Sequence, residues 1–227
     1  QLKELPELEQ FILHKIFLLN ENFINYFRNY DFHNLYKELL NFCTVDLSAF
    51  YFDIRKDVLY CDPIDTKKRK STIILLKVIL SSLLKWFAPI LSFTTEEIYQ
   101  LVSKKNKSIH LEKFTNMPKQ FENFELCNKM NEIIKIRDIC NVSIEEKRAN
   151  KEIGSSLEAE LEIKLNKKLY ELTLDIDFAE LCITSKSSVE LNDKDEIIVN
   201  TKKAKGNKCP ICWKIKTESC ERSSCPV

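Results

Sequence analysis

Glycine is almost absent from this sequence, which has only Gly154 and Gly206 among its 227 residues. Loops that cradle phosphate groups with backbone N–H groups need several closely spaced glycines, as in the patterns GxGxxG and GxxxxGK[ST]. Neither pattern can be built from two distant glycines. The usual nucleotide-binding loops are therefore excluded.

The sequence also lacks an excess of charge of either sign. It has 35 basic and 34 acidic residues, which gives a formal net charge of +1. Because the chain as a whole is not a polycation, any attraction to nucleic acid must come from a local basic patch.

No apolar run is long enough to cross a bilayer. The longest, residues 73–87, is interrupted by Lys77, Ser81, Ser82 and Lys85. A membrane span needs about 20 predominantly apolar residues, and no signal peptide is visible. We expect no membrane partner.

The N-terminus and the cysteines bear on the origin of the chain. The first residue is Gln1 and no methionine precedes Met117, so we expect the natural protein to have upstream sequence. Of nine cysteines, five lie singly in apolar segments, as buried thiols do in a reducing compartment: Cys43, Cys61, Cys127, Cys140 and Cys182. We expect a cytoplasmic protein.

Helical periodicity dominates the first 150 residues. Apolar residues recur at spacings of three and four in residues 8–27 and 35–54, and residues 71–88 are apolar nearly all round. Pro89 should end that third helix, and Thr94 with Glu97 has the form of a capping box for a fourth. Short connections favour an antiparallel bundle over residues 1–122. These stripes predict a core and say nothing of function.

The pattern changes after a charged helix expected from about residue 126 to 150. Apolar and charged residues then alternate over residues 157–165, which predicts a half-buried strand. Short apolar runs at residues 181–183 and 197–199 suggest further strands. The fold class is thus mainly α: a helical bundle, then a helix with a small α+β module over residues 123–200, then a tail over residues 201–227.

The tail carries a candidate metal site. Cys209 and Cys212 form a CxxC pair, and two thiolates at that spacing can bind one tetrahedral Zn²⁺ if a second pair completes the site. Cys220 and Cys225 are the candidates for the second pair. Zinc would supply folding energy that a short polar segment lacks. A redox pair, or a tail with free thiols, is the alternative.

The tail is also basic. Residues 201–227 hold seven basic residues against two acidic ones, next to the aromatic Trp213. Basic side chains contact phosphates, and an indole can stack on an unstacked base. A solvated tail is the simpler interpretation of the composition alone.

Several stretches resemble one enzyme family. The segment NFCTVDLSAFYFDIRKDVLYCDP (41–63), the run KRKS after it and LKWFAPILSFTTEEIYQLV (84–102) resemble the anticodon-binding domain of the isoleucyl, valyl and leucyl class I synthetases. IRDICNVSIEEKRANKEIGSSLEAEL (136–161) and the CPICW tail are similar to the isoleucyl-tRNA synthetases in particular. The resemblance covers nearly the whole chain in one order, and the tail resembles a zinc-ribbon-like module.

The resemblance implies a tRNA(Ile)-binding segment of an enzyme that attaches isoleucine to tRNA with ATP as substrate. The bundle would hold the anticodon stem-loop and the tail would reach the loop. Arg137, Arg148, Lys151 and Trp213 are carried over as candidates for RNA contact or module docking. The alternative for Arg137 and Arg148 is a structural pairing with nearby carboxylates.

This sequence departs from the family pattern in two respects. Ser223 stands where the family has its fourth zinc ligand, and Cys225 follows two residues later. The family's HIGH and KMSKS signatures are missing, and the run 67–71 (KKRKS) is interpreted as a basic loop and helix start. We therefore expect no catalytic residue in this segment.

The expected partners are tRNA(Ile) and the upstream catalytic domain of the same polypeptide. We expect no DNA partner, and a monomeric protein. The alternative is a free-standing RNA-binding protein derived from such a segment.

Overall fold

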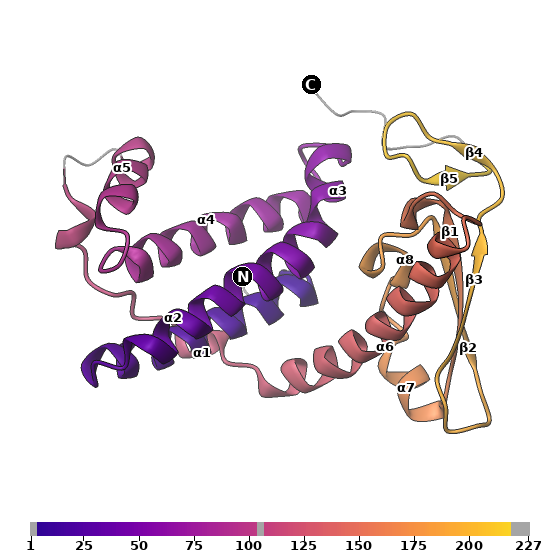
Figure 1. Ribbon diagram of the computed structural model, residues 1–227, viewed down its shortest axis with the longest axis horizontal. Coiled ribbons are helices and arrows are strands. Elements are labelled where there is room, and N and C mark those ends of the chain that lie inside the picture. The colour runs from indigo at the N-terminus through magenta and orange to yellow at the C-terminus, as the bar shows by residue number, and fades with distance from the viewer. Residues whose placement is uncertain (1–3, 104–106, 219–227) are drawn as a thin grey trace. The chain divides into compact units, whose positions relative to one another are not determined.

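The computed structural model describes residues 4–103 and 107–218 (Figure 1). Helices occupy most of the described chain up to residue 149. They are α1 (Glu7–Arg28), α2 (Phe32–Asn41), a π-helical segment (Phe42–Phe52), α3 (Asp53–Cys61), α4 (Lys67–Phe87), α5 (Ser92–Val102), α6 (Phe124–Ala149), α7 (Lys167–Leu172) and α8 (Phe178–Leu181), with short 3-10 turns at Ile109–Leu111, Lys119–Phe121 and Ser156–Glu158.

Five strands follow α6. They are β1 (Ala159–Leu165), β2 (Lys186–Leu191), β3 (Ile198–Lys203), β4 (Asn207–Lys208) and β5 (Ile215–Lys216). Strands β2, β1 and β3 form one sheet in that order, with β2 parallel and β3 antiparallel to β1. The predicted fold class, mainly α with a small α+β part, is confirmed.

Contacts divide the described chain into two compact units. The first comprises residues 4–53 and 65–124, and the second comprises residues 54–64 and 125–218. The predicted domains, residues 1–122, 123–200 and 201–227, stay a prediction. Local sequence patterns do not indicate that residues 54–64, which include most of α3, pack with the second unit.

The helices of the first unit pack around aromatic side chains. Trp86 of α4 is buried, stacks on Phe23 at 6.1 Å between ring centroids, and donates from Nε1 to Asn20 Oδ1 at 3.2 Å. The predicted stripes are confirmed for α1 and α2. Helix α4 is not enclosed on all sides, however, because Ile74 and Leu80 are exposed.

A π-helical segment interrupts the second predicted helix. Its buried residues are Phe42, Leu47, Phe50 and Tyr51, and the first two are five positions apart, a spacing wider than the 3.6-residue α turn. Periodicity in the sequence did not predict this change of helix type.

Two helix boundaries test the sequence signals directly. Helix α4 ends at Phe87, two residues before Pro89, as predicted. The capping box at Thr94 is wrong: α5 begins at Ser92, and its N-cap residue Leu91 makes no side-chain capping bond. None of the helices in the described ranges combines the length and apolarity needed to span a membrane.

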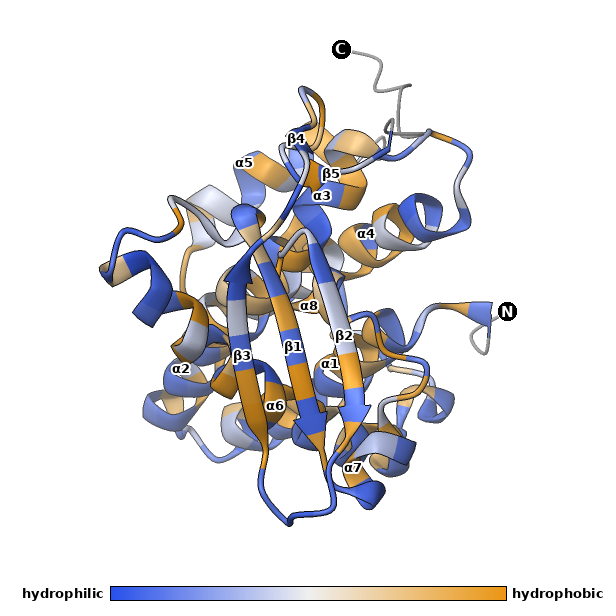
Figure 2. Ribbon diagram, turned by 90° about the vertical axis from the view of Figure 1, so that its right-hand side faces the viewer, coloured by the Kyte–Doolittle hydropathy of each residue, from blue (hydrophilic) through white to orange (hydrophobic). Residues whose placement is uncertain are grey.

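In the second unit, β1 is the centre of the core. Its alternate residues Ala159, Leu161, Ile163 and Leu165 are fully buried, and α6 and α8 lie on that side of the sheet (Figure 2). Ser143 of α6 and Thr201 of β3 share a 2.7 Å hydrogen bond. The predicted strand at residues 181–183 is wrong, because Leu181 ends the helical turn α8. Of the run 197–199, residues 198 and 199 begin β3 and residue 197 precedes it.

Candidate nucleic-acid interface

A short hairpin carries the CxxC pair. Strands β4 and β5 pair antiparallel, and the turn between them is closed by Cys209 N donating to Lys214 O at 2.9 Å and Trp213 N donating to Cys209 O at 3.0 Å. Gly206 precedes the hairpin with φ +135°, and a Cβ there would lie 2.3 Å from Lys216 O. Only glycine fits this position.

The two thiols of the pair are buried in a segment with little core. Cys209 is 7% exposed and Cys212 5%, and both cluster with Cys61 from the end of α3. The Cys61 sulfur lies 3.9 Å from the carbonyl oxygen of Ile211, between the paired cysteines. Sequence reasoning missed Cys61, since nothing in its local pattern indicates a neighbour 150 residues away.

The donor set fits half of a tetrahedral zinc site. Two adjacent thiols, deprotonated on binding, are ligands that Zn²⁺ prefers. Within residues 4–103 and 107–218, no cluster of three or more His, Cys, Asp or Glu side chains is arranged to hold a metal ion. The predicted ligands Cys220 and Cys225 lie outside the described residues.

Trp213 presents an exposed aromatic face on this hairpin. Its side chain is 60% exposed, and the ammonium of Lys208 lies 5.6 Å from the centroid of its ring. Its backbone has φ +60°, a left-handed conformation that costs a non-glycine residue roughly 1–2 kcal/mol. A solvent-facing indole next to a cation suits stacking on an unstacked nucleobase.

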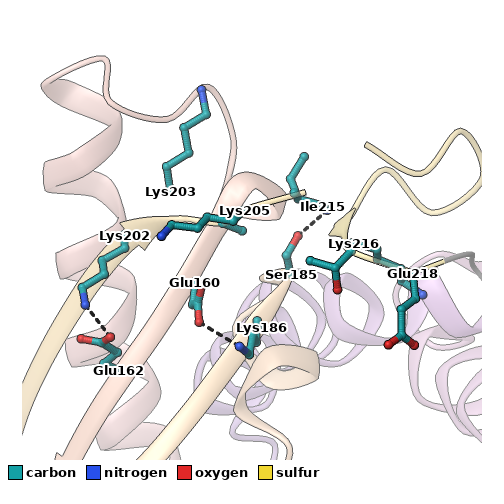
Figure 3. Close-up of a pocket in the computed structure, with 12 residues that line it drawn as sticks. Glu160, Glu162, Ser185, Lys186, Lys202, Lys203, Lys205, Ile215, Lys216 and Glu218 are labelled. Atoms are coloured by element: carbon teal, nitrogen blue, oxygen red, sulfur yellow. Dashed lines mark hydrogen bonds and ion pairs between the residues drawn. The ribbon is translucent and has the colours of Figure 1, made fainter. Parts of the chain in front are cut away.

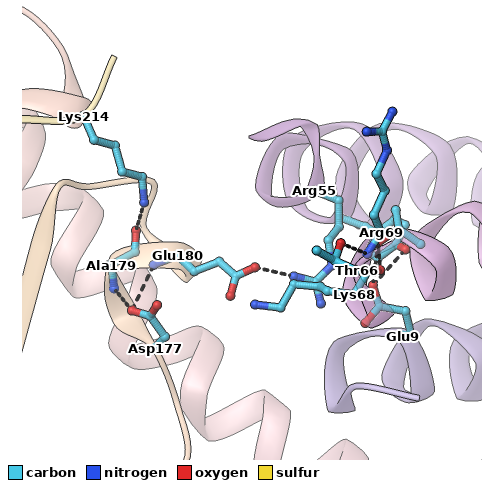
Figure 4. Close-up of polar contacts among 11 residues, drawn as sticks. Glu9, Arg55, Thr66, Lys68, Arg69, Asp177, Ala179, Glu180 and Lys214 are labelled. Carbon is cyan, nitrogen blue, oxygen red and sulfur yellow. Dashed lines mark hydrogen bonds and ion pairs between the residues drawn. The ribbon is translucent and has the colours of Figure 1, made fainter. Parts of the chain in front are cut away.

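Polar contacts tie the hairpin to the rest of its unit. The amide of Ile215 donates to Ser185 Oγ at 2.6 Å, and Lys214 Nζ reaches Ala179 O at 3.5 Å. Figure 4 shows Lys214 directed at Ala179 of α8, and shows the neighbouring Glu180 extended toward Arg55. The hairpin is thereby fixed near α8 and the start of β2.

The basic candidates on α6 occupy two separate places. Arg148 and Lys151 line a shallow hollow of about 480 Å³ at the C-terminal end of the helix. Arg148 pairs with Glu145 at 2.6 Å, which is the carboxylate pairing that the sequence left open. Arg137 lies eleven positions earlier, about 16 Å along the helix axis. Contact of these three residues with RNA stays a prediction.

Arg137 makes a hydrogen bond to the end of α8. Its Nε donates to the carbonyl oxygen of Leu181 at 2.9 Å, and its side chain is half-buried. A side chain held in this way docks the last turn of α8 onto α6. This contact agrees with the docking role suggested beside RNA contact.

Lys151 is part of the helix terminus itself. Its φ is +60°, and the amides of Lys151 and Glu152 donate to the carbonyls of Arg148 and Lys147, both at 3.0 Å. These two bonds make a Schellman motif, in which glycine is the preferred left-handed residue. A lysine occupies it here, in a chain with only two glycines.

The sequence is also similar to known proteins. Residues 9–163 match the family described as the anticodon-binding domain of tRNA ligase. The chain is 63% identical over 223 residues to the isoleucine--tRNA ligase of Pelagibacter ubique (strain HTCC1062), with 98% of this chain and 25% of that protein aligned. Identity is 38% to the isoleucine--tRNA ligase of Bartonella quintana and 36% to that of Agrobacterium fabrum, with 92% and 95% of this chain and 23% of each relative aligned. The chain thus spans about a quarter of the length of these relatives.

Proposed function

The chain belongs to the anticodon-binding domain family of tRNA ligases, and from that membership we propose that it recognises the anticodon arm of tRNA(Ile). It corresponds to a segment of isoleucine--tRNA ligases that includes the anticodon-binding domain. The observation that carries the proposal is the family match over residues 9–163, which covers the helices of the first unit and continues through α6 to β1.

The hairpin supports the same function from its own chemistry. RNA sequence is read mostly on unstacked loop bases, by stacking and by hydrogen bonds to base edges. The exposed Trp213 with Lys208 offers one such stacking face. In this proposal the helical unit holds the anticodon stem-loop, and the hairpin of the second unit contacts bases of the loop.

The complete protein would be an isoleucine--tRNA ligase that attaches isoleucine to tRNA(Ile) with ATP as substrate. The chemistry would lie in the catalytic domain of the same polypeptide, and this segment would bind and align the tRNA without a catalytic residue of its own. The relatives' names and the extent of the matches support this assignment.

One structural zinc ion is part of the proposal. Cys209 and Cys212 would supply two thiolates, and Cys220 and Cys225 would supply the other two. The metal would hold the turn that displays Trp213. It would supply folding energy and no reaction step.

Binding to two transcripts tests the proposal. The purified chain is titrated with tRNA(Ile) and tRNA(Val) over a series of salt concentrations, and zinc content is measured on the same sample. Preference for tRNA(Ile) that disappears when its anticodon is changed supports anticodon recognition. Equal, steeply salt-dependent binding of both transcripts indicates phosphate contacts alone and overturns the proposal.

A further inference from the structure

An open hollow of about 970 Å³ lies on the second unit between the sheet and the hairpin. The sheet contributes Glu160, Glu162, Lys186 and Lys202, and β5 contributes Ile215 and Lys216. Lys203 and Lys205 line its upper side (Figure 3). The hollow is thus walled by the same hairpin that displays Trp213.

Ion pairs neutralise the floor of the hollow. Lys186 pairs with Glu160 at 3.2 Å, and Lys202 pairs with Glu162 at 2.5 Å, both across neighbouring strands. Asn200 also donates to Glu162 at 3.1 Å. The hydrogen bond from Lys202 is the main cause that lowers the pKa of Glu162, so this carboxyl stays ionised and keeps its lysine in place.

Two further lysines of the hollow take no part in these ion pairs. Lys203 and Lys205 are exposed, and no carboxylate in residues 4–103 and 107–218 lies within ion-pairing distance of either ammonium. Figure 3 shows Lys203 directed away from the two glutamates, and Lys205 extended above Glu160 and away from Ile215. Among the described residues neither ammonium has an ion-pair partner, although the carboxylate of Glu218 also lines the hollow. Two such lysines at the rim suit an anionic ligand.

The position of the hollow favours one kind of anion. Ile215 of its wall lies two residues from Trp213, a separation of at most about 7 Å along the backbone. A nucleic-acid strand with a base on the indole can therefore continue into the hollow. Small anions gain nothing from this proximity, whereas a single-stranded RNA segment uses both features at once.

We propose that this hollow binds the phosphate backbone of a single-stranded RNA segment, through Lys203 and Lys205, next to the base that stacks on Trp213. The inference rests on the proposed function and adds the site that the strand follows. Glu160 and Glu162 act as positioning residues that hold the two paired lysines against the sheet.

The salt dependence of binding gives a direct test. Each phosphate neutralised on a single strand contributes about 0.7 to the slope of log K against log salt. For the double variant Lys203→Ala/Lys205→Ala we expect the slope for an anticodon stem-loop RNA to fall by about 1.4. The same slope predicts about 25-fold weaker binding at 0.1 M salt, with the two proteins converging near 1 M.

A matched control uses two lysines of α7. Lys167 and Lys168 are exposed, belong to the same unit and do not line the hollow. Lys167→Ala/Lys168→Ala removes the same charge and should leave slope and affinity nearly unchanged. Equal losses in both double variants would mean that only net charge matters, and would overturn the site.

Further outcomes separate this inference from the proposed function. Suppose that the unaltered chain prefers tRNA(Ile) but Lys203→Ala/Lys205→Ala has the same slope of log K against log salt. The assignment of the hollow as a phosphate-binding site is then wrong, and the proposed function stands. If the chain binds a duplex RNA as tightly as the stem-loop, and with the same lysine dependence, the single-strand assignment is overturned. If it binds no RNA at all, both are overturned. Retention of the native circular dichroism spectrum and Tm in each variant confirms that folding is intact.

Discussion

The guanidinium of Arg55 lies 2.6 Å from the carboxylate of Glu180, a residue 125 positions later in the chain. The Arg55 side chain is almost completely buried, and Glu180 is one-fifth exposed. This pair joins α3 to α8 within the second unit. It gives residues 54–64 a polar anchor in addition to their apolar packing.

Removal of the anion from this pair should be costly. Glu180→Ala leaves a buried cation with reduced compensation, and we expect it to lower the free energy of unfolding by about 3 kcal/mol. Denaturant titration followed by circular dichroism measures the loss. Glu145→Ala is the control, because it breaks the exposed pair with Arg148 and should cost less than about 1 kcal/mol. Equal effects of the two changes would mean that burial of Arg55 has little energetic weight.

The left-handed conformation of Lys151 predicts a stabilising substitution. Lys151→Gly removes the steric cost of φ +60° in the Schellman motif, partly offset by greater freedom of the unfolded chain. We expect a gain of about 0.5–1 kcal/mol in thermal unfolding. Val142→Gly, at an exposed helical position within α6, should instead cost about 0.5 kcal/mol. A variant Lys151→Gly that is more stable yet binds tRNA less tightly would identify Lys151 as an RNA contact.

Trp213 allows backbone strain and base stacking to be separated. Trp213→Gly relieves the left-handed strain but removes the indole, so the hairpin should remain folded while tRNA affinity falls about 5- to 150-fold. Fluorescence anisotropy with labelled tRNA(Ile) measures the loss. Trp213→Phe keeps a stacking face and should recover part of the affinity. Unchanged affinity in Trp213→Gly would rule out a stacking role.

The proposed zinc ion depends on the buried cysteine pair. Cys209→Ser and Cys212→Ser should each abolish the binding of one zinc per chain, as measured by metal analysis, and should reduce the near-ultraviolet circular dichroism signal of Trp213. Cys43→Ser, at a half-buried position on the π-helical segment of the first unit, should retain the metal. A chain purified without zinc that still holds a native hairpin would contradict the structural role.

His14 predicts how the first unit responds to acid. Its ring is fully buried, and Nδ1 accepts a hydrogen bond from the amide of Asn123 at 3.0 Å. Burial is the main cause that lowers its pKa below the ordinary value of 6.5, with a smaller lowering from Lys15 and an opposing effect of Glu122. Because the unfolded chain binds the proton more readily, this contribution to stability is complete above about pH 6.5 and decreases as the pH falls below it.

The pH dependence has a direct check. The free energy of unfolding should decrease below pH 6.5 by at most about 1.4 kcal/mol per pH unit for this one proton. His14→Asn can still accept the bond from Asn123 and should flatten this part of the curve. His33→Asn, at an exposed histidine, is the control for the loss of an imidazole outside the core. An identical acid response in His14→Asn would assign the effect to other groups.

The sequence predicted features that depend on neighbours three or four residues apart. Periodicity located α1, α4 and α6, Pro89 marked the end of α4, and alternation located β1. The strand predicted from the short apolar run at residues 181–183 was wrong, because such a run fits a buried helical turn as well as a strand. Thr94 matched a capping pattern although α5 had already begun at Ser92.

Contacts between residues far apart in the sequence could not be predicted from local patterns. The pairing of Arg55 with Glu180, the position of Cys61 beside the CxxC pair and the shared hollow of Glu160 and Lys205 all join parts of the chain that local patterns treat separately. Trp213 and the cysteine pair could be proposed from residue type and spacing alone. Their burial, exposure and backbone strain required the three-dimensional structure.

The discontinuous second unit has a consequence for synthesis on the ribosome. Ile54, Val58 and Cys61 of α3 are buried in that unit, but the sixty residues from Asp65 to Phe124 are translated before the rest of it begins. At 5–20 residues per second, this interval lasts about 3–12 s. During that time the first unit is being completed, while the apolar side of α3 has no final partner and is a candidate binding site for a chaperone.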